Sequence, residues 1–128
     1  MFYPKHMQGV NEPWEQLPAA AGEYKAGQLL GVSNGQLAAL SAATKTTPPY
    51  LCMEDCTAEA GGLVHVARIN KEHIYVTTLS AETASAKLGA LLEVTAGGLQ
   101  ADGAAAGTFE VVHVEGTAAG SEVHGRFQ

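Results

Sequence analysis

The residues of this chain best suited to acid–base or metal chemistry are its five histidines: His6, His65, His73, His113 and His124. Three of them, His65, His113 and His124, fall in segments that we predict to be strands, and three imidazoles that converged could hold zinc. No two of these three share a ligand spacing such as His-x-His or His-x-x-x-His. The alternation of the last strand turns Val123 and Phe127 to the core and His124 outward. We therefore expect surface histidines, no metal site and no cofactor.

The two cysteines, Cys52 and Cys56, lie four residues apart, and the chain has no second pair. Two strand residues four apart are roughly 13 Å apart, too far for a disulfide unless the chain bends. We expect reduced thiols buried as small apolar groups. The two aspartates, Asp55 and Asp102, fall in predicted turns, and the phosphate-loop, dinucleotide and zinc-protease patterns are absent. These residues favour a protein that is not an enzyme.

Composition disfavours two classes of partner. The 128 residues carry a net charge of −6, and only 16% are charged. A protein that neutralises phosphates or anionic lipid usually carries the opposite sign, so we expect neither nucleic acid nor membrane as a partner. There is no run of 18 apolar residues and no signal-peptide pattern at the beginning of the sequence. A soluble protein made in a reducing compartment is the expectation.

Residues 1–22 differ from the remainder, residues 23–128, because they hold three of the five prolines and three aromatic residues without strand-like alternation. Proline after nearly every short run interrupts helices and strands alike. We predict an extended arm with at most one helical turn near Glu12–Leu17. Large apolar side chains on such an arm suggest docking onto another protein. The expected anchors are Phe2, Tyr3, Trp14 and Leu17.

Residues 23–128 are predicted to form an all-β domain, a small barrel or tulip-like core of seven to nine short strands. Asn34-Gly35 between two apolar runs is a strong hairpin signal, because both turn positions need a positive φ. An alanine-rich stretch at 80–88 predicts one short helix. The predicted strands are 28–32, 37–40, 50–54, 63–69, 74–79, 91–94, 99–101, 108–114 and 122–127.

The β-rich domain also repeats itself. Gly27–Leu37 returns as Gly89–Leu99 at an offset of 62, and later identities return at an offset of 58, which predicts two copies of one module over 27–69 and 89–127. The alternative is chance recurrence of leucine, valine and glycine patterns. The two arginines, Arg68 and Arg126, occupy equivalent places in these copies. They are either specific partner contacts or a solvated strand face.

Several of these segments are similar to one known family. Gly27-Gln28-Leu29-Leu30, the Ser33-Asn34-Gly35 turn, a Pro-Pro loop, Tyr50–Asp55 and Val64–Arg68 resemble the small head decoration proteins of tailed bacteriophages, of the phage lambda type. The aromatic, proline-rich first 20 residues are similar as well. The second half, Gly89–Phe127, departs from this pattern.

The resemblance implies a virion protein on the exterior of an expanded capsid, made in the cytoplasm of the bacterial host. It implies homotrimers that bridge and cement neighbouring major capsid subunits. In that family the first residues are mobile when free and ordered on the shell, which would make the predicted arm the docking element.

Two alternatives remain open from the sequence. One is another phage virion component, such as a tail or head–tail adaptor protein, which copy number per particle would distinguish. The other is a small β-barrel enzyme or ligand-binding protein, which a pocket with converging His65 and His113 would favour.

Overall fold

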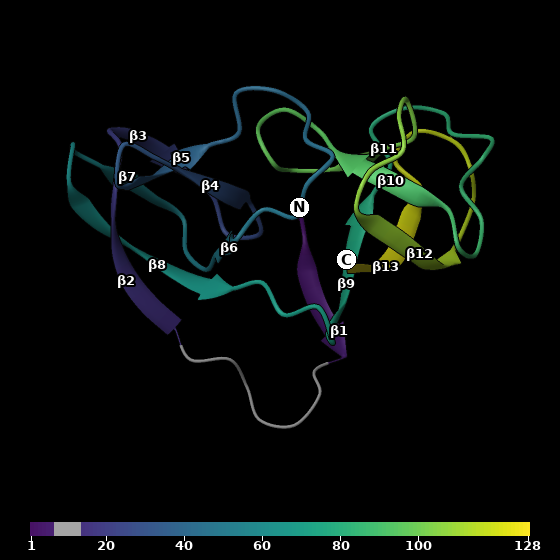
Figure 1. The fold of residues 1–128 in the computed structure, drawn as a ribbon, viewed down its shortest axis with the longest axis horizontal. Helices are drawn as coiled ribbons and strands as arrows, with labels where there is room; N and C mark the ends of the chain where they lie inside the picture. The colour runs from purple at the N-terminus through teal and green to yellow at the C-terminus, as the bar shows by residue number, and fades with distance from the viewer. Residues whose placement is uncertain (7–13) are drawn as a thin grey trace.

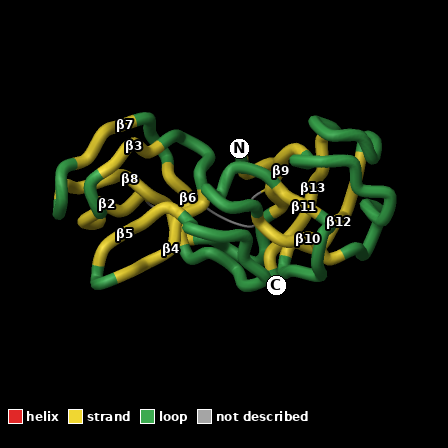
Figure 2. The backbone as a smooth tube through the Cα atoms, turned by 90° about the horizontal axis from the view of Figure 1, so that it is seen from above, coloured by secondary structure: helices red, strands yellow, loops and turns green. Residues whose placement is uncertain are grey.

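The chain folds into two all-β lobes that lie side by side (Figures 1 and 2). The computed structural model describes residues 1–6 and 14–128, and within them it contains thirteen strands and no helix. The strands are β1 (Tyr3–His6), β2 (Trp14–Ala19), β3 (Gly22–Tyr24), β4 (Leu29–Ser33), β5 (Gln36–Ala39), β6 (Tyr50–Cys52), β7 (Cys56–Ala58), β8 (Gly62–Arg68), β9 (Ile74–Thr78), β10 (Leu91–Val94), β11 (Ala101–Asp102), β12 (Phe109–Val114) and β13 (Glu122–Phe127). The prediction of an all-β protein is confirmed, with more strands than the expected seven to nine.

No helix among the described residues is long and apolar enough to cross a membrane.

The first lobe is a closed barrel with the strand order β2-β5-β4-β6-β8 and a separate β3-β7 ribbon. The β4–β5 hairpin turns at Asn34 (φ 52°) and Gly35 (φ 75°), which confirms the turn predicted from this pair. β2 closes the barrel: it runs antiparallel to β8 along its whole length and meets β5 through Ala19 and Leu37. The inward side chains of these strands form one apolar core.

The second lobe is an open six-stranded sheet with the order β1-β9-β13-β12-β10-β11. Its core is rich in aromatic rings, with Phe109 and Phe127 5.0 Å apart between centroids. Phe2 enters this core from the strand at the edge of the sheet and packs edge-on against Phe109 at 5.5 Å. The first strand of the chain therefore belongs to the second lobe, as its place beside β9 in Figure 1 shows.

The two lobes repeat one strand order, which supports the predicted duplication. The barrel order β5-β4-β6-β8-β2 corresponds to β11-β10-β12-β13-β9 in the open sheet. Each copy thus runs in sequence as a strand, a hairpin and two further strands. The copy begins earlier than predicted, at β2 and at β9, because its first strand lies before each hairpin.

The register of the two copies corrects their alignment by one residue. Tyr50 pairs with Arg68 in the first lobe, and Phe109 pairs with Phe127 in the second, so both positions correspond at an offset of 59 (109 − 50 and 127 − 68). The offset of 58 predicted from sequence was wrong here. Arg68 corresponds to Phe127, and the predicted equivalence of the two arginines does not hold.

The prediction that residues 1–22 form an extended arm was wrong for the described residues. Trp14–Ala19 is a full barrel strand, and the expected helical turn is absent from 14–17. β2 is paired with β8 along its whole length but pairs with β5 through Ala19 alone. Pro18 lacks a backbone N–H, and this loss costs little on the β5 side of the strand, where few ladder hydrogen bonds form. Residues 12 and 13 lie outside the described residues.

The helix predicted over 80–88 is also absent. The backbone N–H groups of this segment bond to distant carbonyls, with Ser80 donating to Ala101 at 3.0 Å and Thr83 donating to Thr117 at 2.7 Å. Ala86 is buried in the second core. Tertiary packing therefore overrides the helix propensity of the alanines.

The lobes are joined through shared packing. Leu29 and Leu51 of barrel strands contribute side chains to the core of the second lobe. The Leu29 N–H donates to the carbonyl of Gly98 at 2.8 Å, which bonds a barrel strand to the turn after β10. The two modules therefore pack against each other, and the core of the second lobe includes side chains from the barrel.

Candidate functional site

The outward face of the β2–β8 ribbon carries large apolar side chains, and we call this surface the β2–β8 face. Register places Trp14 opposite Ala67, Gln16 opposite His65, and Pro18 opposite Leu63. Trp14 is 57% exposed and Leu63 59% exposed. Apolar groups thus lie at both ends of the face, with a polar pair between them.

A hydrogen-bonded network holds the polar centre of this face. His65 Nδ1 lies 2.8 Å from Glu54 Oε1, and Gln16 Nε2 lies 2.8 Å from His65 Nε2. The amide N–H of Gln16 donates, so Nε2 accepts and the ring proton sits on Nδ1, bonded to the carboxylate. The Trp14 ring lies 6.0 Å from the His65 ring. The side chains at the centre of the face are therefore held in place in the free protein.

His65 holds the pKa of the Glu54 carboxyl below its ordinary value, chiefly through the side-chain hydrogen bond. A depressed folded-state pKa stabilises the protein above the unfolded pKa, and the contribution is lost as the pH falls through the folded value. In His65→Asn we expect the Glu54 pKa to rise toward its ordinary value in a carboxyl-carbon NMR titration. Glu115, whose pKa is lowered chiefly by its bond to His113, should keep its titration curve and serves as the internal control. An unmoved Glu54 curve would contradict the network.

A second group of titratable residues lies on the outer face of the second lobe at the β12–β13 pair. Glu115 and Glu122 approach His124 so closely that one ligand atom from each lies within 4.8 Å of the others. His113 adds a ring 5.0 Å from that of His124 and bonds Glu115 at 2.9 Å. We call His113, Glu115, Glu122 and His124 the His–Glu quartet.

His124 is buried, and the prediction that it faces the solvent was wrong. Alternation does turn it away from the core, but the tilted His113 ring packs against its ring and Lys5 Nζ lies 3.2 Å from its Nδ1. An ammonium can only donate, so Nδ1 accepts and the ring N–H is on Nε2, which donates to Glu122 Oε1 at 2.7 Å. The spacing rule missed this group because its members come from two strands, two residues apart on each.

The predicted partner-binding residues fall into different environments. Phe2 is fully buried in the second core, so its expected role as a surface anchor was wrong. Tyr3 and Trp14 are exposed, and Leu17 packs partly buried against the barrel core. Arg68 lies over the Tyr50 ring at 5.1 Å and donates to its hydroxyl at 3.0 Å.

Arg126 is exposed, and register places it opposite Glu110. His65 and His113 do not converge: each bonds a glutamate in its own lobe, Glu54 and Glu115 respectively. The pocket that would have favoured an enzyme at these two histidines is therefore not formed.

Both cysteines are free, and Cys52 is buried as predicted, whereas Cys56 is half-buried. Desolvation raises the pKa of each thiol. The Cys52 thiol donates to the Glu54 carbonyl at 3.1 Å. These properties fit small apolar groups and not reactive thiolates.

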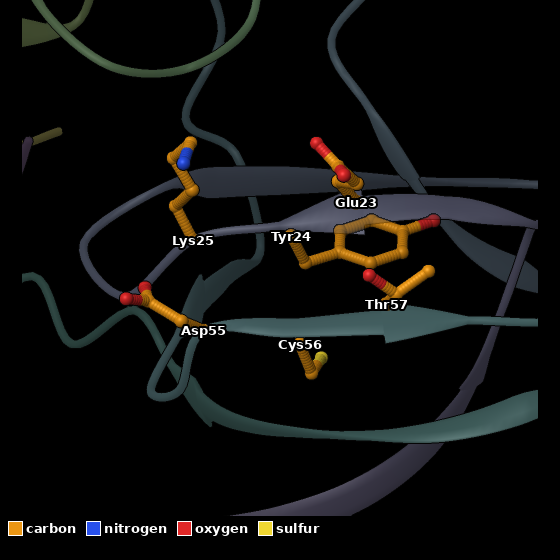
Figure 3. A pocket seen from close by; sticks show the side chains of 6 residues that line it. All are labelled: Glu23, Tyr24, Lys25, Asp55, Cys56 and Thr57. Atoms are coloured by element: carbon orange, nitrogen blue, oxygen red, sulfur yellow. The ribbon is translucent and has the colours of Figure 1, made fainter.

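A shallow recess of about 270 Å³ lies along the β3–β7 ribbon, lined by Glu23, Tyr24, Lys25, Asp55, Cys56 and Thr57 (Figure 3). Asp55 accepts the N–H of Ala26 at 2.8 Å and so fixes a turn. Cys56 points away from Thr57 and Glu23, toward the barrel core. The recess therefore presents turn residues and a threonine, with the thiol directed elsewhere.

The spacing Gly31-x-Ser33-x-Gly35 matches the nucleophile motif of α/β-hydrolases in letters only. That motif needs a sharp turn from a strand into a helix, whereas Ser33 lies at the β4–β5 hairpin. The serine pairs with Gln36 across this hairpin, so the structural context of the motif is missing.

Comparison with known proteins adds no assignment: no model of a protein family matches the chain, and neither does any curated protein sequence.

Proposed function

We propose that this chain is a structural virion protein that binds the outside of an expanded phage capsid and cements neighbouring major capsid subunits. The observation that carries the proposal is the β2–β8 face, with Trp14 and Leu63 more than half exposed on a closed barrel. Exposed tryptophan on a rigid strand is typical of the anchors of protein interfaces. The resemblance of the barrel segments to phage decoration proteins indicates the kind of partner, which is the surface of a capsid.

The proposed docking differs from that of a mobile arm. The anchors Trp14 and Leu63 lie on paired strands, and the Gln16–His65–Glu54 network holds the centre of the face. Binding a preformed surface loses less conformational entropy than ordering a free segment. The proposal therefore predicts rigid-body docking of the barrel, with Tyr3 as a secondary exposed contact of the other lobe.

Several copies of the chain bound together would strengthen the weak contact that each β2–β8 face makes with the capsid. We propose trimers at threefold positions of the shell, so that three β2–β8 faces bind together and gain avidity without any single strong contact. The net charge of −6 suits an exterior position, away from packaged DNA. Sedimentation equilibrium of the free protein is expected to give the mass of three chains.

Replacing Trp14 by serine is expected to weaken binding to expanded, DNA-free capsids of the encoding phage by about 30-fold or more, the effect of removing one interface anchor worth about 2 kcal/mol. The measurement is co-sedimentation of the full chain with shells across a concentration series. Leu88→Ser is the matched control, since Leu88 is an exposed apolar residue of the other lobe.

Two results would contradict these proposals separately. Failure of the wild-type chain to sediment with expanded shells would overturn the capsid function. Binding by Trp14→Ser and Leu63→Ser that equals the wild type would leave the function standing and overturn the β2–β8 face as its site. Circular dichroism of each variant establishes that the fold is kept.

A further inference from the structure

The His–Glu quartet arises from a mirrored sequence pattern on two paired strands. His113 and Val114 end β12 and Glu115 follows directly, whereas Glu122-Val123-His124 begins β13. Register pairs His113 with His124, and the Glu115 N–H donates to the Glu122 carbonyl at 2.9 Å. Residues two apart lie on the same face of a strand. Both histidines and both carboxylates are therefore presented on one side of the ribbon.

The distances among three of the four residues suit one ion, and the fourth, His113, contacts one of these three. Ligand atoms of Glu115, Glu122 and His124 lie within 4.8 Å of one another. The Nε2 atom of His113 is 2.9 Å from Glu115 Oε1, which puts a fourth donor beside the same carboxylate. Two imidazole nitrogens and two carboxylate oxygens form a donor set that zinc and related divalent transition metals prefer.

The electrostatics of the quartet favour a cation. Like charges directly opposite on neighbouring strands destabilise a sheet. Glu115 and Glu122 lie opposite, and within the described residues the ion-pair partner of each is the histidine two residues away in the sequence. A divalent ion between the carboxylates would remove their repulsion and use both histidines as ligands.

One ligand is already fixed by burial. The His124 residue is 5% exposed, enclosed by the His113 ring and the Lys5 ammonium. Its Nε2 points at Glu122 Oε1 at 2.7 Å. A donor held in place in this way loses little entropy when it binds a metal, unlike an exposed histidine on a flexible loop.

We propose that His113, Glu115, Glu122 and His124 bind one divalent transition-metal ion with the ligand preferences of zinc. The site is separate from the β2–β8 face, and capsid binding does not depend on it.

Lys5 opposes binding in a way that can be measured. Coordination through Nε2 requires the ring proton to move to Nδ1, where it needs an acceptor. The Lys5 ammonium at Nδ1 can only donate, so it must turn away before the metal is bound. In Lys5→Gln the side-chain oxygen can accept that proton. This variant is therefore expected to bind zinc several-fold more tightly than the wild type.

The test is titration of the tag-free, metal-stripped full chain with zinc against a chromophoric chelator. We expect one equivalent, with affinity reduced about tenfold or more in Glu115→Gln and again in Glu122→Gln. Both carboxylates are exposed, so these variants should keep the fold. Nitrogen NMR of the His124 ring should show the proton shifting from Nε2 to Nδ1 on zinc addition.

Glu54→Gln is the matched control, because the Glu54–His65 pair has a similar contact, of 2.8 Å, without the second glutamate and histidine of the quartet. Its zinc affinity should equal that of the wild type. Cys56→Ser tests thiol binding and should also leave the affinity unchanged. The proposal is overturned by no zinc binding, by equal affinity in the Glu115→Gln, Glu122→Gln double variant, or by loss of binding in Cys56→Ser. Weaker binding in Lys5→Gln would contradict Nε2 ligation.

Discussion

Phe2→Ala is expected to lower the free energy of unfolding by about 3–5 kcal/mol, the usual loss for a buried phenylalanine. The side chain is 0% exposed and packs against Phe109 at 5.5 Å and Phe127 at 5.8 Å. Truncation would leave a cavity between two rings that strands β12 and β13 hold in place, so little relaxation can fill it. Urea unfolding followed by near-ultraviolet circular dichroism measures the loss.

Tyr3→Ala is the matched control for this prediction. Tyr3 follows Phe2 directly as the first residue of β1, and it is exposed. We expect its truncation to change stability by less than about 1 kcal/mol. Equal effects of the two variants would mean that the beginning of the chain is not part of the second core.

Gly98→Ala is expected to lower stability by roughly 3 kcal/mol or more, because backbone strain and overpacking act together. Gly98 has φ +75°, and a Cβ there would overlap the carbonyl oxygen of Leu29. That contact lies where the barrel strand meets the turn of the second lobe, and the Leu29 N–H bonds Gly98 in the same place at 2.8 Å. The clash can be relieved only by moving backbone, which would separate the two lobes.

Gly97→Ala is the control that separates the cost of the left-handed backbone from the cost of the steric clash with Leu29. Gly97 has a similar φ of +84°, but a Cβ there meets nothing within 4 Å. We expect a loss of about 1 kcal/mol, the ordinary penalty of a left-handed conformation for alanine. Thermal unfolding of both variants is the measurement, and a Gly98→Ala loss as small as that of Gly97→Ala would contradict a close junction between the lobes.

The elements that the sequence predicted well are those with strong local signals. Asn34-Gly35 gave the hairpin because few dipeptides accept two positive φ angles. β10 and β13 match the predicted ranges 91–94 and 122–127. The recurrence of glycine turns together with apolar strand positions predicts the repeat, and the strand order of the two lobes agrees with it.

The missed elements depend on contacts between distant residues. Trp14–Ala19 contains a proline, which predicts an arm, yet it is the strand that begins the first copy and it pairs with β8. Comparison with the second copy could have found it, since a strand also precedes the second hairpin at β9. The alanine-rich segment at 80–88 is not helical, because its backbone N–H groups include two that donate to the carbonyls of Ala101 and Thr117. No local sequence pattern reveals these hydrogen bonds.

The same distinction between local signals and contacts of distant residues applies to the candidate sites. Trp14 could be named from its type alone, because a large aromatic residue near polar neighbours suggests an interface. The His–Glu quartet could not, because its two halves are joined only by strand pairing. The pattern His-x-Glu followed by Glu-x-His, read as a hairpin with mirrored polar positions, is the signal that would have found it.

The placement of Phe2 also dictates an order of events during synthesis. Its ring partners, Phe109 and Phe127, lie more than 100 residues later in the sequence and are translated long after it. The barrel strands β2 to β8 are all translated before β9, so the first lobe can assemble while the second is still being made. Phe2 must then stay accessible until β12 and β13 have been translated, which makes completion of the second lobe a slow, late step dominated by long-range contacts.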